Sequence, residues 1–321
     1  MSNTETAPAE VACAAVPFAG VLHPREVPLG GPRAIRVRRT LPQRERSLIG
    51  AWCFVDHYGP HDVRGGTGMD VPPHPHTGLQ TVSWLFSGEV EHRDSAGVHA
   101  MVRPGELNLM TSGAGICHSE VSTSATTILH GVQLWVALPD EARDTDRGFA
   151  HFVPVPRLVG DATLRVFLGE LEGLRSPVNT FTPLLGAQVD LDPGAEVRLR
   201  VDPGFEHGVL LDHGDVSVGG VPLEVADLAF QAAGTDRLDL ANRGTEPARL
   251  VLLGGPPFPE ELVMWWNFVG RSHDDIATYR ALWEKGDDRF GAVAGYEGAT
   301  ERLRAPALPN ATLRPRRNPW V

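Results

Sequence analysis

The feature that most constrains this chain is a series of short apolar runs, each the length of a strand, separated by turn residues. The runs LQTVSWLFSGE, AMVRPGELNLMTSGAG and TILHGVQLWVALP follow one another up to about residue 138. Val, Ile, Trp, Phe and Leu dominate them and favour strands, while 35 Gly and 27 Pro supply turns along the chain. Regularly spaced short strands of this kind are typical of antiparallel sandwiches and barrels.

A second series of runs, between about residues 160 and 255, resembles the first in order. Setting Gly88 against Gly214 aligns TGLQTVSWLFSGEV with PGFEHGVLLDHGDV, and RPGELNLMTSG then matches LEVADLAFQAAG. A chain of 321 residues is long for one core, so two domains are expected. The predicted fold class is therefore all-β, with two tandem antiparallel β-barrels or sandwiches followed by a short C-terminal helix.

The expected domain boundaries follow from composition and from helix signals. The first twenty residues are rich in Ala, Pro, Thr and Glu without periodicity, which indicates a disordered tail. In SHDDIATYRALWEKGD, Ser272 can cap a helix whose apolar residues recur at helical spacing. The predicted segments are a tail at 1–20, a first β domain at 21–155, a second at 156–258, and a helix with a Pro-rich tail at 259–321.

Charge and cysteine content narrow the function classes. A formal net charge of −11 argues against direct binding to nucleic acid, because phosphates require a basic surface. The basic stretch RAIRVRRTLPQRER is interpreted as a solvated strand face, and RPRRNPW as part of the tail. No signal peptide and no long apolar stretch is apparent, and Cys13, Cys53 and Cys117 do not suggest a disulfide framework. We expect a cytoplasmic protein that does not bind membranes.

Histidines cluster in the first series of runs. Seven of the 13 histidines lie between residues 57 and 118, namely His57, His61, His74, His76, His92, His99 and His118. In a strand His74 and His76 would project to one face while Pro75 points away, and His118 and Glu120 are again two residues apart. An isolated H-x-H pattern is weak evidence for a metal site, since single buried histidines are commonly structural. Two such pairs facing each other, however, would place three imidazoles and one carboxylate around a point.

Such a set predicts one divalent metal. Imidazole and carboxylate ligands suit Fe(II), Mn(II), Ni(II), Cu(II) or Zn(II), and ligand type alone does not choose among them. In the same alignment, the second copy has Arg200 and Asp202 at the positions of His74 and His76. Only the first domain is therefore expected to bind metal. His207 and His213 are interpreted as structural or surface residues, and Cys117 should point away from the metal.

These residues are similar to those of the pirins, bicupin proteins of the cupin superfamily. The resemblance runs from VRRTLPQRER and FVDHYGP through HPHTGLQTVSWLFSGEVEHRDSAG, RPGELNLMTSGAGICHSE and GVQLWVALP to PFPEELVMWWNFVGRSHDDI. It implies cupin-type domains, with a metal bound by His74, His76, His118 and Glu120 in the N-terminal one, and it favours Fe(II). Gln80 stands where relatives commonly carry Glu. That position is not a pirin ligand, so we expect the change to affect the surroundings of the site or its charge.

The resemblance also implies an activity. Several relatives resemble quercetin 2,3-dioxygenases, which open a flavonol or a related enolic aromatic compound with O2 and release carbon monoxide. Glu120 would then also accept the substrate proton as general base. Candidate pocket residues, each also compatible with ordinary core, are the apolar Phe54, Trp84, Met110, Leu134 and Trp135 and the polar His57, His92 and Gln133; His92 lies in the charged stretch VEHRD and could equally be exposed.

The alternative is an iron-containing regulatory or interaction protein that acts through a protein partner without catalysis. A wide apolar opening above the metal would favour the enzyme. A plugged site beside an exposed basic patch would favour the regulator. The expected partners are thus a small aromatic substrate and O2 in the first case and a protein in the second.

Overall fold

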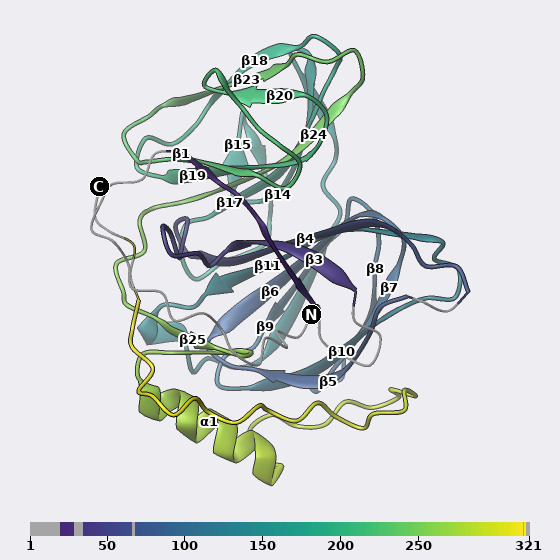
Figure 1. Cartoon of the computed structure of the whole chain (residues 1–321), viewed down its shortest axis with the longest axis vertical. Coiled ribbons are helices and arrows are strands. Elements are labelled where there is room, and N and C mark those ends of the chain that lie inside the picture. Colours follow the sequence, from purple (N-terminus) through teal and green to yellow (C-terminus); the bar gives the residue numbers. More distant parts are fainter. Residues whose placement is uncertain (1–19, 29–34, 66–67, 317, 319–321) are drawn as a thin grey trace.

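The computed structural model describes residues 20–28, 35–65, 68–316 and 318. These residues form two β-sandwiches that follow one another along the long axis of the molecule, with helix α1 beyond the first sandwich (Figure 1). Each sandwich packs a seven-stranded sheet against a four-stranded sheet, and neighbouring strands are antiparallel. The predicted all-β fold of two tandem sandwiches with a C-terminal helix is confirmed.

The first sandwich contains most of the first half of the chain. Its larger sheet has the order β12 (Gly148–Phe152), β9 (Leu107–Thr111), β6 (Leu79–Ser87), β11 (Ile128–Ala137), β4 (Trp52–Asp62), β3 (Arg36–Leu41) and β2 (Arg25–Pro28). Its smaller sheet has the order β5 (Asp70–His76), β10 (Ile116–Ser122), β7 (Val90–Asp94) and β8 (His99–Val102).

The second sandwich repeats this order. Its larger sheet runs β1 (Gly20–Leu22), β22 (Leu228–Gln231), β19 (Glu206–His213), β24 (Ala248–Gly255), β17 (Leu185–Leu191), β14 (Ala162–Leu168) and β13 (Arg157–Val159). Its smaller sheet runs β18 (Glu196–Arg200), β23 (Arg237–Asn242), β20 (Val216–Val218) and β21 (Val221–Pro222), and β15 (Glu170–Leu171) pairs with β16 (Leu174–Arg175). The sandwiches thus match strand by strand, in agreement with the internal repeat of the sequence.

The N-terminal strand departs from the expected boundary. The segment 21–22 was expected in the first domain, but Gly20, Val21 and Leu22 pair with Phe230, Ala229 and Leu228 at the edge of the second sandwich. The chain enters the first sandwich only at β2. The predicted tail at residues 1–19 lies outside the described residues.

A continuous apolar layer joins the two sandwiches. Trp52 Nε1 donates to the carbonyl oxygens of Leu185 and Gly254 at 3.2 Å each, and Trp84 Nε1 donates to Gln188 Oε1 at 2.9 Å. Each indole comes from the first sandwich and each acceptor from the second. The same cluster includes Leu134, Leu210 and Val251, so the seven-stranded sheets pack face to face.

The basic stretch near residue 40 is only partly a solvated face, because Arg36 and Arg44 are exposed but two other arginines are buried. Arg39 and Arg46 have exposed fractions of 1% and 0%. Arg39 donates from Nε and Nη2 to the carboxylate of Asp56 at 2.7 and 2.8 Å, and Arg46 Nη1 donates to Glu206 Oε1 at 2.9 Å. The interpretation is wrong for Arg39 and Arg46, because each buried guanidinium has a carboxylate partner that lies outside the basic stretch.

The C-terminal segment covers the smaller sheet of the first sandwich. It contains the hairpin β25 (Val263–Trp265) and β26 (Phe268–Gly270) and helix α1 (His273–Lys285). Ser272 forms the predicted N-cap in a capping box with Asp275, and Gly286, at φ 77°, ends the helix. Below the sheet, Leu303 N donates to Pro73 O at 2.8 Å. No helix among the described residues has the length and apolarity needed to span a membrane.

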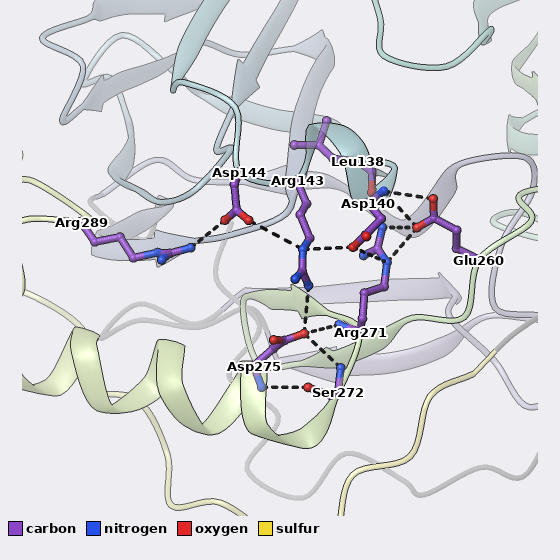
Figure 2. Close-up of polar contacts among 9 residues, drawn as sticks. All are labelled: Leu138, Asp140, Arg143, Asp144, Glu260, Arg271, Ser272, Asp275 and Arg289. Atoms are coloured by element: carbon purple, nitrogen blue, oxygen red, sulfur yellow. Dashed lines mark hydrogen bonds and ion pairs between the residues drawn. The ribbon is translucent and has the colours of Figure 1, made fainter.

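An ion-pair network connects this segment to the end of the first sandwich (Figure 2). Arg143 lies just after the 3-10 turn η1 (Asp140–Ala142), and its Nη1 donates to Asp275 Oδ2 at 3.0 Å. Arg271 Nη2 donates to Leu138 O at 2.7 Å and pairs with Glu260. The first turn of α1 is therefore joined by an ion pair to the turn that follows β11 (Ile128–Ala137).

Candidate metal centre

Three imidazoles converge inside the first sandwich. His74 and His76 lie on β5, His118 lies on the neighbouring β10, and His118 is directly opposite His74 in the ladder. All three side chains are fully buried, and one ring nitrogen of each lies within 4.8 Å of those of the other two. His76 Nε2 and His118 Nε2 are 3.1 Å apart.

Hydrogen bonds to the backbone determine which nitrogens face the centre. His74 Nδ1 lies 2.9 Å from Pro72 O, and His76 Nδ1 lies 3.2 Å from Asn267 O. A carbonyl oxygen only accepts, so each Nδ1 carries the proton and each Nε2 presents a lone pair inward. His74 Nε2 is buried without a hydrogen-bond partner, as expected for an atom that coordinates an ion.

This arrangement fits a divalent transition metal. Burial lowers the pKa of all three histidines well below the usual range, so the rings are neutral, as ligands must be. Ligands at right angles on a metal at about 2.1 Å are separated by about 3 Å, close to the spacing of His76 Nε2 and His118 Nε2.

Glu120 lies next to this group rather than within it. Its carboxylate, 2% exposed, forms a second potential ligand group with His118 and His92. The register against β5 shifts between His118 and Glu120, but His118, Ser119 and Glu120 pair regularly with Asp94, Arg93 and His92 of β7, so Glu120 shares the face of β10 that carries His118. Ser83 Oγ lies 3.4 Å from Glu120 Oε1 and donates to Gln133 Oε1 at 2.9 Å. The structure thus brings three of the four predicted ligands together and places the fourth, Glu120, in a second group that shares His118.

Two supporting residues behind His118 were not assigned this role from sequence. His92 Nδ1 lies 3.4 Å from His118 Nδ1, and His92 Nε2 lies 3.1 Å from Asp94 Oδ2. Asp94 Oδ1 accepts the backbone N–H groups of Ala96 and Val98, which fixes the carboxylate. His92 is 4% exposed, and its alternation with Val90 and Asp94 along VEHRD was the signal for an inward face.

Several predicted pocket residues do lie beside the imidazoles. Trp135 stacks on Phe54 with ring centroids 4.0 Å apart and meets His76 edge-on at 5.1 Å. Trp135 Nε1 and Gln133 Nε2 are buried without a hydrogen-bond partner. Met110 is buried opposite Phe149, whose ring lies 5.0 Å from that of His92. This side of the sheet offers aromatic walls and two free donors.

The other predicted pocket residues lie on the opposite face of the same sheet. His57 Nε2 lies 2.6 Å from Asp212 Oδ1 of the second sandwich. Trp84 reaches Gln188, and Leu134 packs in the interdomain layer. Gln80 alternates with Val82 and Trp84, so it also belongs to this face, where its Nε2 donates to Thr111 Oγ1 at 2.9 Å. The Gln80 side chain, at the position where relatives commonly carry Glu, therefore points away from the imidazoles.

The second sandwich has an apolar interior at the matching place. Its four-stranded sheet turns Val197, Leu199, Leu238 and Leu240 inward, while Arg200 is largely exposed. Of its described residues, only Asp212 belongs to a potential ligand group, and both partners of Asp212 come from the first sandwich. His207 is buried and His213 is partly exposed.

Cys117 does not belong to the centre. It packs with Trp265, Trp266 and Phe268 of the C-terminal segment, on the face of β10 opposite His118. Burial raises the pKa of its thiol to about 12, so the thiolate that metals prefer is disfavoured.

Comparisons with known proteins agree with this geometry. The chain is 44% identical to a Pseudomonas aeruginosa protein named as a candidate quercetin 2,3-dioxygenase, over 89% of each chain. It is 30% identical to human pirin over 75% of this chain and 84% of that protein. The crystal structure of quercetin 2,3-dioxygenase from Acinetobacter baumannii superposes with a TM-score of 0.87 at 37% identity, covering 93% of this chain and 98% of that one.

Family models cover both sandwiches. The model described as Pirin matches residues 34–136, which include the three convergent histidines and Glu120. The model described as Pirin C-terminal cupin domain matches residues 186–291, from the second sandwich through α1. Together they span more than half of the sequence, and the chain therefore belongs to the pirin family.

Proposed function

We propose that this protein uses O2 to open a flavonol or a related enolic aromatic compound, at a divalent metal bound by His74, His76 and His118 with Glu120. The observation that carries the proposal is the set of three buried imidazoles whose Nδ1 atoms are occupied or shielded and whose Nε2 atoms converge. The names of the bacterial relatives support the reaction class.

Fe(II) is the proposed metal, with Mn(II), Ni(II), Cu(II) and Zn(II) as alternatives compatible with the ligand types. When bound, the metal would supply a Lewis acid that lowers the pKa of a substrate hydroxyl and a centre for reaction with O2. The protein's own contribution is to fix the three rings: Pro72 O and Asn267 O orient two of them, and His92 supports the third.

Glu120 is the proposed general base. Its carboxylate lies in the same buried group as His118, so it would accept the proton of the substrate hydroxyl at one carboxylate oxygen. The single Ser83 hydroxyl proton has two acceptors, Glu120 Oε1 and Gln133 Oε1. Ser83 can therefore donate to Glu120 when the carboxylate is charged and turn to Gln133 when it is protonated.

The stacked pair of Phe54 and Trp135 would face a flat aromatic substrate. Gln133 Nε2 and Trp135 Nε1 are donors without a protein partner, and a buried donor in that state gains from an acceptor on a ligand. Oxygen substituents of a flavonol supply such acceptors.

The regulatory alternative rests on the burial of the centre. His74, His76 and His118 have no exposed surface, so a substrate must displace neighbouring groups to reach them. A metal that alters a surface through the covering C-terminal segment needs no such opening, because Asn267 of that segment already contacts His76. Because the net charge of −11 disfavours binding to nucleic acid, the partner in this alternative would be a protein.

Oxygen uptake on adding quercetin to anaerobically Fe(II)-loaded protein tests the enzyme directly. We expect uptake with release of carbon monoxide, abolished in His74→Ala and retained in His99→Ala, which removes an exposed histidine. No uptake by fully loaded protein with quercetin or simpler enolic aromatics would reject the dioxygenase and favour the regulatory role.

A further inference from the structure

A second convergence of imidazole and carboxylate atoms lies between the two sandwiches. His57 on β4 and His130 on β11 come from the first sandwich, and Asp212 on β19 comes from the second. One ligand atom of each lies within 4.8 Å of the other two. The group is distinct from the candidate metal centre, because His57 and His130 project from the opposite face of the sheet that carries Gln133 and Trp135.

Both imidazoles approach the same oxygen atom. His57 Nε2 and His130 Nε2 each lie 2.6 Å from Asp212 Oδ1. The His57 contact has hydrogen-bond geometry, whereas His130 Nε2 is buried without a hydrogen-bond partner despite the short distance. A ring nitrogen this close to a carboxylate oxygen, without a proton aligned between the two, is in a repulsive contact that a cation bound by both would relieve.

The remaining contacts of Asp212 keep its other oxygen occupied. Oδ2 lies 3.0 Å from His213 Nδ1 and 3.3 Å from Arg249 Nη1. Arg249 in turn lies over Phe86, which meets His130 edge-on at 5.0 Å. These contacts fix the carboxylate and leave Oδ1 as the atom that faces the two imidazoles.

Charge and burial define the ion that would fit. Burial lowers the pKa of His57, so its ring is neutral and available as a ligand. Arg249 and the nearby Arg38 add positive charge, which disfavours cations held by charge alone, such as Mg2+ or Ca2+. Two imidazoles and one carboxylate instead suit Zn(II), Ni(II) or Cu(II). The His130 side chain, 12% exposed, marks the side from which the ion would enter.

We propose that His57, His130 and Asp212 form a second site for Zn(II) or a similar transition metal, which crosslinks the two sandwiches. At usual ligand distances of about 2.1 Å and with tetrahedral geometry, ligand atoms are about 3.4 Å apart, so the imidazoles would retreat from Asp212 Oδ1 by about 0.8 Å. Water would occupy the open position. The site is structural, since it lies away from the centre proposed for chemistry.

The test uses Zn2+ and the full chain with the first centre removed. His118→Ala should still bind one equivalent of Zn2+ after equilibrium dialysis, measured by elemental analysis, and Zn2+ should raise its melting temperature. Adding His130→Ala, or Asp212→Asn, which keeps the shape of the side chain, should abolish both the binding and the shift. Adding His99→Ala should change neither, because that exposed histidine is paired only with Glu91 at 2.7 Å.

Two results would overturn the site. One is an absence of Zn2+ binding by folded His118→Ala at concentrations well above those that saturate the wild type. The other is one equivalent retained by the His118→Ala/His130→Ala protein. Circular dichroism establishes that each variant is folded, and neither result depends on dioxygenase activity, so the two proposals fail independently.

Discussion

At the scale of single residues, two imidazole nitrogens 3.1 Å apart account for much of the proposed chemistry. His76 Nε2 faces His118 Nε2, and the Nδ1 proton of His76 is already donated to Asn267 O. Lone pairs at this distance repel unless a proton or a cation lies between them. A bound metal would therefore take the place of the proton between His76 and His118.

Replacing His74 or His118 by Ala should abolish Fe(II) loading of the candidate metal centre, because each removes one of three convergent nitrogens. The measurement is metal content after anaerobic Fe(II) loading. His207→Ala is the matched control, since His207 is equally buried but lies in the second sandwich. Full stoichiometry in the His74 and His118 variants would exclude this centre.

Glu120→Gln should lower turnover at least a hundredfold, the usual effect of losing a general base, while altering the melting temperature little. The amide keeps the shape and can still accept from Ser83 Oγ. A turnover rate equal to that of the wild type would exclude Glu120 as the base, whether or not metal content changes.

His207 should make stability depend on pH. Burial lowers its pKa to about 4, and both ring nitrogens lack partners. The unfolded chain, with a pKa near 6.5, binds the proton first, so stability is complete above about pH 6.5 and falls as the pH drops toward about 4. The loss is on the order of 3 kcal/mol.

Denaturant unfolding of wild type and His207→Leu at pH 7 and pH 4.5 measures this contribution. The variant should lose less stability between the two pH values than the wild type does. Equal losses would show that the pKa of His207 is the same in the folded and the unfolded chain.

At the scale of elements, local sequence signals were enough to predict α1 but not enough to predict which face of each strand lines the site. Ser272 and Asp275 form the capping box within four residues, so the helix was predictable. Strand alternation already placed Phe54 and His57 on opposite faces, and both could not line one pocket. Which face meets the imidazoles depends on Asp212, 155 residues away, and no local pattern contains that contact.

The cap of α1 gives a prediction at this scale. Ser272→Ala should lower the free energy of unfolding by about 1 kcal/mol, because the N–H of Asp275 loses its acceptor. Ser272→Asn, which restores a side-chain acceptor, should be close to neutral. Equal destabilisation by both substitutions would indicate a packing effect in place of capping.

At the scale of the whole molecule, a buried ion pair spans the two sandwiches. Burial lowers the pKa of Arg46 and raises that of Glu206, so the loss of solvation outweighs the attraction between the partners. Such a pair contributes little net stability but is costly to break, because the remaining charge is left buried. Glu206 also accepts the N–H of Gly50 at 2.9 Å.

Glu206→Leu should therefore destabilise the protein by about 3–5 kcal/mol, and Arg46→Met in the same chain should recover most of that loss. Glu26→Ala is the control, because its partner Arg36 lies on the surface and such pairs contribute about 1 kcal/mol or less. Thermal or denaturant unfolding of the four proteins suffices. A double variant as unstable as the single one would show that Arg46 packs for reasons other than its charge.

The pairing of β1 with the second sandwich has a consequence for synthesis on the ribosome. Residues 20–22 emerge early, yet their partner strand, Leu228–Gln231, is made some two hundred residues later. Asn267, which orients His76, and Leu303, which bonds Pro73 beside His74, emerge later still. The nascent chain can collapse around the first sandwich, but its N-terminal strand must wait for residues 228–231 and its histidine cluster for Asn267 and Leu303. Metal loading of this centre should accordingly follow synthesis of the C-terminal segment.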